Sequence, residues 1–235
     1  GYIGSHTCAA LIEAGYHPVV IDNLRNTRLS VKEAIEEISG KALEFYELDA
    51  KDGKTVSNSI GHIDGVIHFA ALKSVGESIE KPMEYYTENL ESLLSIIQVA
   101  NEKNAKNFIF SSSATVYGDT KESCVTEETP LGKPLNPYGH TKILGEKILQ
   151  SGKQEFKTIL LRYFNPVGAH DSAKIGELPN GVPNNLVPYI TQTAAGKREK
   201  LTVFGNDYNT KDGTCIRDFI HVVDLAEAHV AALNY

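Results

Sequence analysis

A tyrosine and a lysine stand four residues apart in the segment NPYGHTK, as Tyr138 and Lys142. If the segment is helical, residues i and i+4 share a face, so the phenol and the ammonium lie one turn apart. A free tyrosine has a pKa near ~10, and a neighbouring positive charge favours its phenolate. The spacing is therefore typical either of an ordinary helix-surface pair or of a tyrosine whose pKa is lowered by the lysine so that it acts as a general base.

A serine offers a third group. Ser113 closes the apolar run NFIFSSS, where a strand should give way to a loop. Its hydroxyl can hydrogen-bond the same substrate oxygen and hold it against Tyr138. Such a trio suits removal of a proton from an alcohol while a hydride leaves the same carbon.

Short apolar runs that read as buried strands surround these residues, at 65–71, 107–118 and 158–165. Helical patterns lie between them, notably at 89–103 and 138–152. Strands that alternate with helices predict an α/β fold with a doubly wound, Rossmann-like parallel sheet covered on both faces. The apolar stripe of 89–103 is expected to pack on the sheet.

Polar residues gather where the predicted strands end. Asp22, the stretch 69–73, the serines 111–113 and Asn165 all fall at a strand-to-loop junction. Parallel sheets bind ligands outside the carboxyl ends of their strands. We therefore expect one ligand site along this edge.

The chain opens with a glycine pair, Gly1 and Gly4, directly before a helical pattern, followed by a strand that ends in Asp22. This arrangement is typical of the second half of a dinucleotide-binding motif, in which glycines admit a pyrophosphate at a helix N-terminus and an acid binds ribose hydroxyls. An ordinary tight turn is the alternative. We expect a strand and at least one more glycine to precede Gly1.

The cofactor that Asp22 favours is NAD, because its charge would repel the 2′-phosphate of NADP. Arg25 nearby could weaken that preference, but a solvent-facing role fits it better. The predicted NAD-binding domain spans 1–168 and lacks its first strand. A Gly/Pro/Asn-rich stretch then indicates a partial substrate-binding region over 169–235, of which 216–235 returns to the sheet as a strand and a helix.

Composition excludes several classes of protein. The 235 residues are 41% hydrophobic and 23% charged, as in globular enzymes, and the net charge of −7 disfavours non-specific nucleic-acid binding. Three scattered cysteines fit a reducing compartment, so a cytoplasmic location is expected. No apolar run is long enough to span a bilayer, and no membrane partner is expected. His68 and His221 lie in apolar runs without metal-ligand spacing, so we predict core histidines and no metal site.

Several longer segments carry a resemblance, namely GYIGSHT, VIHFAALKSVGES, FSSSATVYGD, NPYGHTK, LLRYFNPVGAH, PNNLVPYI and DGTCIRDFIHVVDLA. The chain resembles the UDP-sugar 4-epimerases of the extended short-chain dehydrogenase/reductase family, from its first residue to its last. The Tyr-x-x-x-Lys pattern is common to the whole superfamily. The SSSATVYG, RYFNPVGAH and PNNL segments are specific to the epimerases or their nearest relatives.

The resemblance implies a homodimeric isomerase of galactose metabolism that interconverts UDP-galactose and UDP-glucose. Tyr138 would take the proton of the sugar 4-hydroxyl while hydride passes from C4 to NAD. The resulting 4-keto sugar would turn over and receive the hydride on its other face. The implied catalytic residues are Ser113, Tyr138 and Lys142.

The resemblance also implies ligand-binding positions. Those for NAD are Gly1, Tyr2, Ile3, Gly4, Asp22, Asn23, Asp49, Ala50, Phe69, Ala70, Lys73, Ser113, Tyr138, Lys142 and Phe164. Those for the UDP-sugar are Ser113, Tyr138, Asn165, Asn185, Leu186, Phe204, Arg217 and Phe219. The fork of Arg217 suits a diphosphate. Surface roles are the alternatives for Lys73 and Arg217.

Three positions depart from the family pattern. Phe219 stands where many members have tyrosine. Glu88 and Ser92 replace an asparagine and a glycine, and these two replacements affect one cofactor contact and the local helix packing.

Two rival functions remain. A nucleotide-sugar dehydratase or decarboxylase shares the scaffold, but dehydratases place an Asp-Glu pair after the catalytic serine, where this chain has Ala114 and Thr115. A non-catalytic NAD-binding scaffold protein is the other rival, and the intact trio disfavours it.

Overall fold

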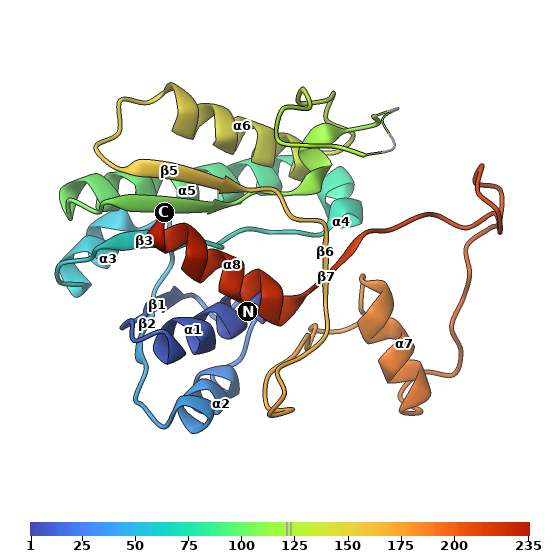
Figure 1. The fold of residues 1–235 in the computed structure, drawn as a ribbon, viewed down its shortest axis with the longest axis horizontal. Coiled ribbons are helices and arrows are strands. Elements are labelled where there is room, and N and C mark those ends of the chain that lie inside the picture. The colour runs from blue at the N-terminus through green and yellow to red at the C-terminus, as the bar shows by residue number, and fades with distance from the viewer. Residues whose placement is uncertain (121, 123) are drawn as a thin grey trace.

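The fold is α/β in the computed structural model, which describes residues 1–120, 122 and 124–235. Helices flank parallel strands on both sides (Figure 1). In chain order the elements are α1 (Tyr2–Glu13), β1 (Val19–Asp22), α2 (Ser30–Ser39), β2 (Glu44–Glu47), α3 (Gly53–Ser59), β3 (Gly65–His68), α4 (Val75–Glu80), α5 (Pro82–Glu102), β4 (Asn107–Ser111), the 3-10 helix η1 (Ala114–Tyr117), α6 (Pro137–Ser151), β5 (Lys157–Leu161), β6 (Asn165–Val167), α7 (Leu186–Ala194), β7 (Phe219–His221) and α8 (Val222–Asn234).

All strand pairs are parallel, which confirms the predicted α/β class. The described strands form three hydrogen-bonded groups, β1-β2, β3-β4-β5 and β6-β7, rather than the one sheet that was predicted. The sequence analysis also did not identify β2. Its sequence, EFYE, has a glutamate at each end, and those ends are exposed, so it lacks the apolar run that marks the other strands.

The main core lies between the β3-β4-β5 sheet and the helices α3, α5 and α6. Phe108, Ile109 and Phe110 of β4 are almost fully buried, as predicted for a strand covered on both faces. On the opposite face α8 packs against β4 and α1. Figure 1 shows α6 above β5 and α1 below β3.

Two predicted helices are present with shifted N-termini. The helix predicted at 89–103 is the C-terminal part of α5, which begins at Pro82. The helix predicted at 138–152 is α6, whose first turn contains Pro137 and whose N-cap Asn136 accepts a hydrogen bond from Gly139 N at 2.8 Å. Proline in the first turn loses no helical hydrogen bond, which explains both start points. The apolar stripe of α5 packs on the sheet as expected.

The C-terminal region is more extended. β6 pairs with β7, α7 lies apart from the other helices, and residues 197–217 reach away from the body of the molecule (Figure 1). The division into domains at residue 168 stays a prediction.

The two predicted core histidines have different environments. His68 is 4% exposed and stacks on Phe110, which confirms it as a core residue. The prediction for His221 is wrong, because its side chain is exposed and its ring accepts the N–H of Val223 at the start of α8. The reason is that β7 is three residues long and, within the described chain, pairs only with β6.

Candidate active site

The carboxyl end of β4 and the first turns of α6 bring the three predicted catalytic side chains together. Ser113 lies two residues after β4 and accepts a hydrogen bond from Thr115 N at 3.2 Å. Tyr138 lies in the first turn of α6, and its phenol is near enough to the hydroxyl of Ser113 for that hydroxyl to favour the phenolate. The Asn136 cap sets where the helix begins and therefore where Tyr138 points.

Lys142 is a buried residue. It is 4% exposed, and its Nζ donates to the carbonyl oxygen of Ser111 at 2.7 Å. The same Nζ lies 4.9 Å from the ring centroid of Phe110 and 5.8 Å from that of Tyr138. Because Lys142 is buried and donates a hydrogen bond to the backbone, Tyr138 and Lys142 are not an ordinary pair on a helix surface.

The electrostatics of the trio correct one prediction. Burial raises the pKa of Tyr138, although the hydroxyl of Ser113 opposes that rise. Burial also lowers the pKa of Lys142, to about 8. The predicted lowering of the phenol pKa by the lysine is therefore wrong for this structure, because loss of water around the phenol outweighs a cation that is directed at the Ser111 carbonyl.

Two further titratable groups face the trio. Tyr163, after β5, hydrogen-bonds with the hydroxyl of Ser111, and burial raises its pKa. Burial, with a smaller contribution from the charge of Lys142, lowers the pKa of His68 to about 3. At pH 7 the buried His68 is therefore neutral, and Lys142 carries the positive charge among these buried groups.

The other end of the predicted site fits a dinucleotide. Helix α1 begins without a side-chain cap, so its first N–H groups are free to donate to a phosphate. Gly4 lies under Phe69, and a Cβ there would come 3.6 Å from the phenylalanine ring. Asp22 places a carboxylate at the last residue of β1, and Asp49 places one just after β2. The N–H groups at the start of α1 suit a pyrophosphate, and the carboxylates of Asp22 and Asp49 suit the hydroxyl groups of a ribose.

Other predicted cofactor residues lie near this edge with partners of their own. The hydroxyl of Tyr2 donates to Gly168 O at 2.7 Å, and Asn23 donates to Asp49 at 3.3 Å. Lys73 is exposed and lies 3.4 Å from Glu177. Phe164 is 41% exposed. The structure places Ile3, Ala50 and Ala70 at the α1 start, after β2 and after β3.

Glu88, one of the departures from the family pattern, belongs to a network of surface charges. Arg25 pairs with Glu84 and lies 3.6 Å from Glu88, which itself accepts from Lys51 at 2.6 Å. Arg25 is therefore held by the acids of α5. Ser92 is buried, and its hydroxyl lies within hydrogen-bond distance of Asn89 O in α5, at 3.2 Å, and of Ala70 O after β3, at 3.5 Å, so a serine fits against this loop.

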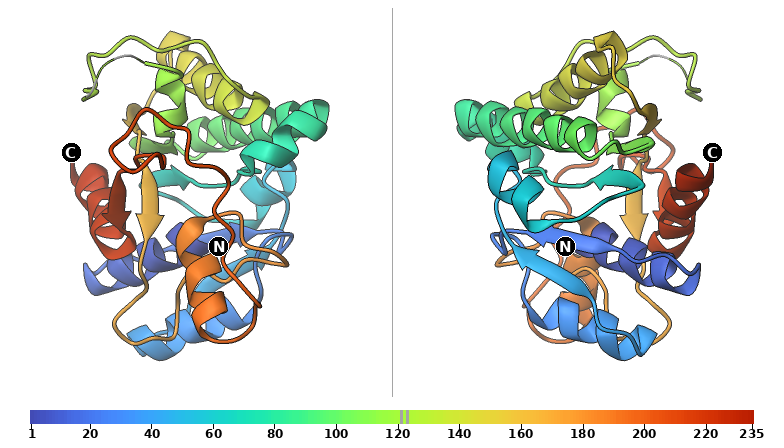
Figure 2. Two further views of the ribbon diagram at one scale, coloured as in Figure 1. Left: turned by 90° about the vertical axis from the view of Figure 1, so that its right-hand side faces the viewer. Right: turned by 90° about the vertical axis from the view of Figure 1, so that its left-hand side faces the viewer.

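The predicted substrate residues beyond the trio do not converge on it. Asn165 donates to Asp218 O at 2.9 Å, and Arg217 donates to Ile216 O beside it. Phe204 is 90% exposed and Phe219 is 46% exposed. Asn185 and Leu186 begin α7, which overlaps the N-terminus in the views of Figure 2 but lies well to its right in Figure 1. A role for these residues in substrate binding stays a prediction.

Two buried polar residues near the trio were missed. Glu146 on α6 is fully buried, and Asn89 on α5 bonds to Leu72 and to Thr141. Glu146 lies one helical turn beyond Lys142, and this spacing could have indicated that its side chain faces the sheet. A charged residue on the face that must pack against the sheet needs a buried partner.

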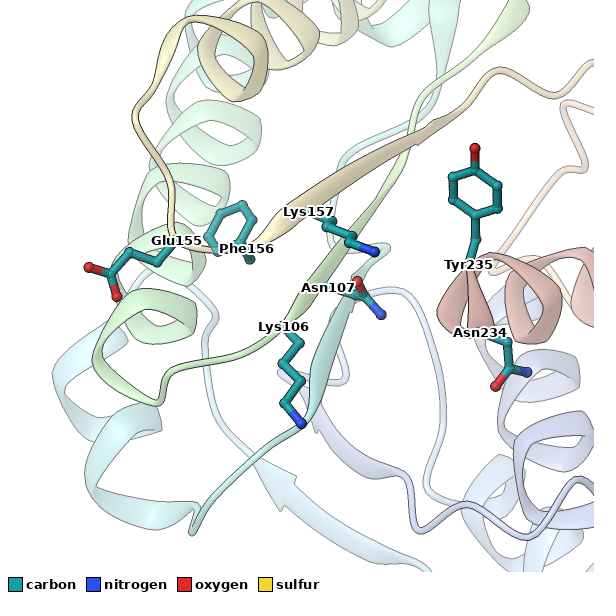
Figure 3. A pocket seen from close by; sticks show the side chains of 7 residues that line it. All are labelled: Lys106, Asn107, Glu155, Phe156, Lys157, Asn234 and Tyr235. Atoms are coloured by element: carbon teal, nitrogen blue, oxygen red, sulfur yellow. The ribbon is translucent and has the colours of Figure 1, made fainter.

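One cavity lies away from the trio. It has a volume of about 540 Å³ and is lined by Lys106, Asn107, Glu155, Phe156, Lys157, Asn234 and Tyr235 (Figure 3). These residues surround the amino ends of β4 and β5, whereas the trio follows the carboxyl end of β4. The described residues include no cluster of three potential metal ligands and no helix long and apolar enough to cross a membrane.

Comparison with known proteins places the chain among relatives of known activity. A family model described as the NAD dependent epimerase/dehydratase family matches residues 1–235. UDP-glucose 4-epimerases of Dictyostelium discoideum and Bacillus subtilis are each 52% identical over the whole chain, which covers 69% and 70% of those proteins. A Bifidobacterium longum UDP-glucose 4-epimerase, crystallised with NAD+ and UDP, superposes with a TM-score of 0.96 at 47% identity. The match covers 100% of this chain and 71% of that one.

Proposed function

Because this chain belongs to the NAD dependent epimerase/dehydratase family, we propose that it is an isomerase that interconverts UDP-galactose and UDP-glucose by inverting C4 of the sugar. The observation that carries the proposal is the meeting of Tyr138, Ser113 and buried Lys142 at one strand end. That arrangement occurs in a chain 52% identical throughout to two enzymes with this name.

The roles of the trio follow from its geometry. Tyr138 accepts the proton of the sugar 4-hydroxyl and returns it to the 4-oxygen after inversion. Ser113 donates a hydrogen bond to the same oxygen and keeps it within reach of the phenol. Lys142 supplies positive charge among buried side chains, where that charge stabilises the phenolate more than it would in water.

NAD fits the edge formed by the start of α1, Asp22 and Asp49. The chemistry that NAD supplies when bound is reversible acceptance of the C4 hydride. Asp22 would bind a ribose hydroxyl, and the free N–H groups of α1 would bind the pyrophosphate. Since burial alone raises the pKa of Tyr138, we expect the phenol to need the additional positive charge of oxidised NAD before it ionises near neutral pH.

A dehydratase or decarboxylase is less consistent with the loop after Ser113. Ala114 and Thr115 open η1, where a dehydratase would carry its additional acid and base. Neither side chain can exchange a proton at neutral pH. The site therefore has one proton-transfer group facing the sugar, as an epimerisation requires.

The expectation for the UDP part rests on Asn165, Asn185, Leu186, Phe204, Arg217 and Phe219. All of these side chains except that of Asn165 are exposed and would contact the nucleotide. Homodimer formation, a cytoplasmic location and a role in galactose metabolism complete the proposal. Support for a dimer comes from α5, which packs beside α6 and leaves Leu94 47% exposed.

The test is to supply UDP-galactose to the protein in its native full length, without any added reductant or oxidant. Appearance of UDP-glucose, approaching the same equilibrium mixture from either sugar, is the expected result. Formation of a dehydrated or decarboxylated product would assign the chain to a rival reaction. Absence of any product in the presence of NAD would contradict the proposal.

A further inference from the structure

Three residues of α6 contact three successive serines. Tyr138, Lys142 and Glu146 are spaced at i, i+4 and i+8, so they lie on one helix face. Lys142 donates a hydrogen bond to the carbonyl oxygen of Ser111, and Glu146 accepts one from the hydroxyl of the next serine, Ser112. The third serine, Ser113, is near the phenol of Tyr138. The segment that follows β4 is thus hydrogen-bonded to α6 at Ser111 and Ser112, directly before Ser113.

The side chain of Glu146 is buried and held by Arg162. It is 0% exposed, and Arg162 binds both its oxygens, with Nε 2.9 Å from Oε1 and Nη2 2.7 Å from Oε2. Arg162 lies after β5 and is in turn held over the ring of Tyr117 at 5.4 Å. A two-pronged pair between planar groups resists rotation. The carboxylate therefore has one orientation, which points an oxygen at Ser112.

We propose that Glu146, oriented by Arg162, is a positioning residue that holds Ser112 so that Ser113 and Lys142 stay in place against Tyr138. It acts through its neighbours and contacts no reacting atom. The proposal depends on the proposed function only for the role of Tyr138 as a base.

The consequence for the phenol follows from the geometry. The hydroxyl of Ser113 opposes the rise in the Tyr138 pKa caused by burial. If Ser112 is released, Ser113 gains freedom and its support of the phenolate weakens, so the phenol becomes harder to ionise. Other titratable groups that face the trio are His68 from β3 and Tyr163 from the end of β5, and neither contacts Glu146 in the described hydrogen bonds.

The decisive variant is Ser112→Ala, which removes one hydroxyl and leaves every charge in place. The ionisation of Tyr138 is followed by ultraviolet difference absorbance between each protein and its Tyr138→Phe counterpart, in the native full-length protein. We expect the midpoint to rise by about 0.5 to 1 pH unit, because weakening one hydrogen bond to the ionised form is worth about that much. We expect kcat to fall about tenfold with KM unchanged.

The matched control is Ser78→Ala, which removes an equally buried serine hydroxyl from α4, where it donates to Val75 O. This variant should leave the midpoint and kcat unchanged. A second test variant, Glu146→Gln, keeps the shape of the side chain but removes the charge that orients Arg162. It should raise the midpoint in the same direction, and adding Ser112→Ala to it should produce little further change.

A midpoint and a kcat in Ser112→Ala that equal those of the unaltered protein would overturn the inference, whatever happens to thermal stability. Equal shifts of the midpoint in Ser112→Ala and Ser78→Ala would overturn it as well. Because the titration needs no turnover, it decides the inference even if the unaltered protein fails to epimerise UDP-galactose, a result that would contradict only the proposed function.

Discussion

At the scale of the residue, the main finding is that the lysine of the Tyr-x-x-x-Lys pair is buried and bonded to the backbone. Spacing alone predicted that Tyr138 and Lys142 share a helix face. It could not predict the direction of the phenol pKa, because that depends on how much water each group loses on folding, which is a property of packing. For the same reason Glu146 was missed, since its partner Arg162 is distant in sequence.

Replacing Lys142 with methionine tests the value of its charge. Lys142→Met keeps the length of the side chain and removes the ammonium, so the phenolate loses its nearest cation and kcat should fall at least ~100-fold. Thermal unfolding should stay within a few degrees of the unaltered protein, because burial of the ammonium is itself costly. A variant that retains full activity would exclude electrostatic support by Lys142.

At the scale of the element, contact between α6 and β4 positions the site. Gly145 permits close approach, since a Cβ there would lie 2.6 Å from Cζ of Phe110, a buried ring that cannot move aside. The apolar period of α6 and the run NFIFS predicted both elements. The start of α6 is set instead by its cap and its proline, and β2 was missed because its sequence, EFYE, has no apolar run and its place in the fold comes from pairing with β1.

A methyl group at this contact should separate the two elements. Gly145→Ala is expected to destabilise the protein by about 1–3 kcal/mol, the usual cost of overpacking, and to lower kcat by moving Lys142 relative to Ser111. Urea unfolding and steady-state kinetics measure the two effects.

The matched control is Gly76→Ala in α4, where a Cβ would meet nothing within 4 Å. It should stabilise by about 0.5–1 kcal/mol, because alanine favours a helix. Equal responses of the two variants would show that the α6–β4 contact is not tight.

At the scale of the whole molecule, the fold class and the strand edge that bears the site were predictable, because alternating elements allow few arrangements. The positions of the predicted UDP-binding residues were not, since they lie on short strands and an extended segment whose contacts are long-range. Burial of histidine side chains also makes the stability of the whole fold sensitive to acid.

Acid sensitivity follows from His68, whose pKa burial lowers from 6.5 to about 3. Between those pH values the unfolded chain binds a proton that the native protein does not, so stability is fully present above pH 6.5 and falls as the pH decreases. The loss from this residue should be about 2–3 kcal/mol between about pH 7 and about pH 4.5. Burial lowers the pKa of His6 and His229 as well and adds to the effect.

The test compares urea unfolding of His68→Leu with that of His62→Leu, whose histidine side chain is 69% exposed. His68→Leu should lose less stability on acidification than the unaltered protein, and His62→Leu should lose the same amount. A steeper acid dependence in His68→Leu would contradict the assignment.

The most direct test of Tyr138 as the catalytic base is the rate of epimerisation of UDP-galactose by Tyr138→Phe in the native full-length protein, loaded with NAD. The phenol oxygen is the group that accepts the 4-hydroxyl proton, so turnover should fall at least ~1,000-fold while NAD binding and thermal stability are retained. Epimerisation at an undiminished rate by this variant would contradict the proposed mechanism.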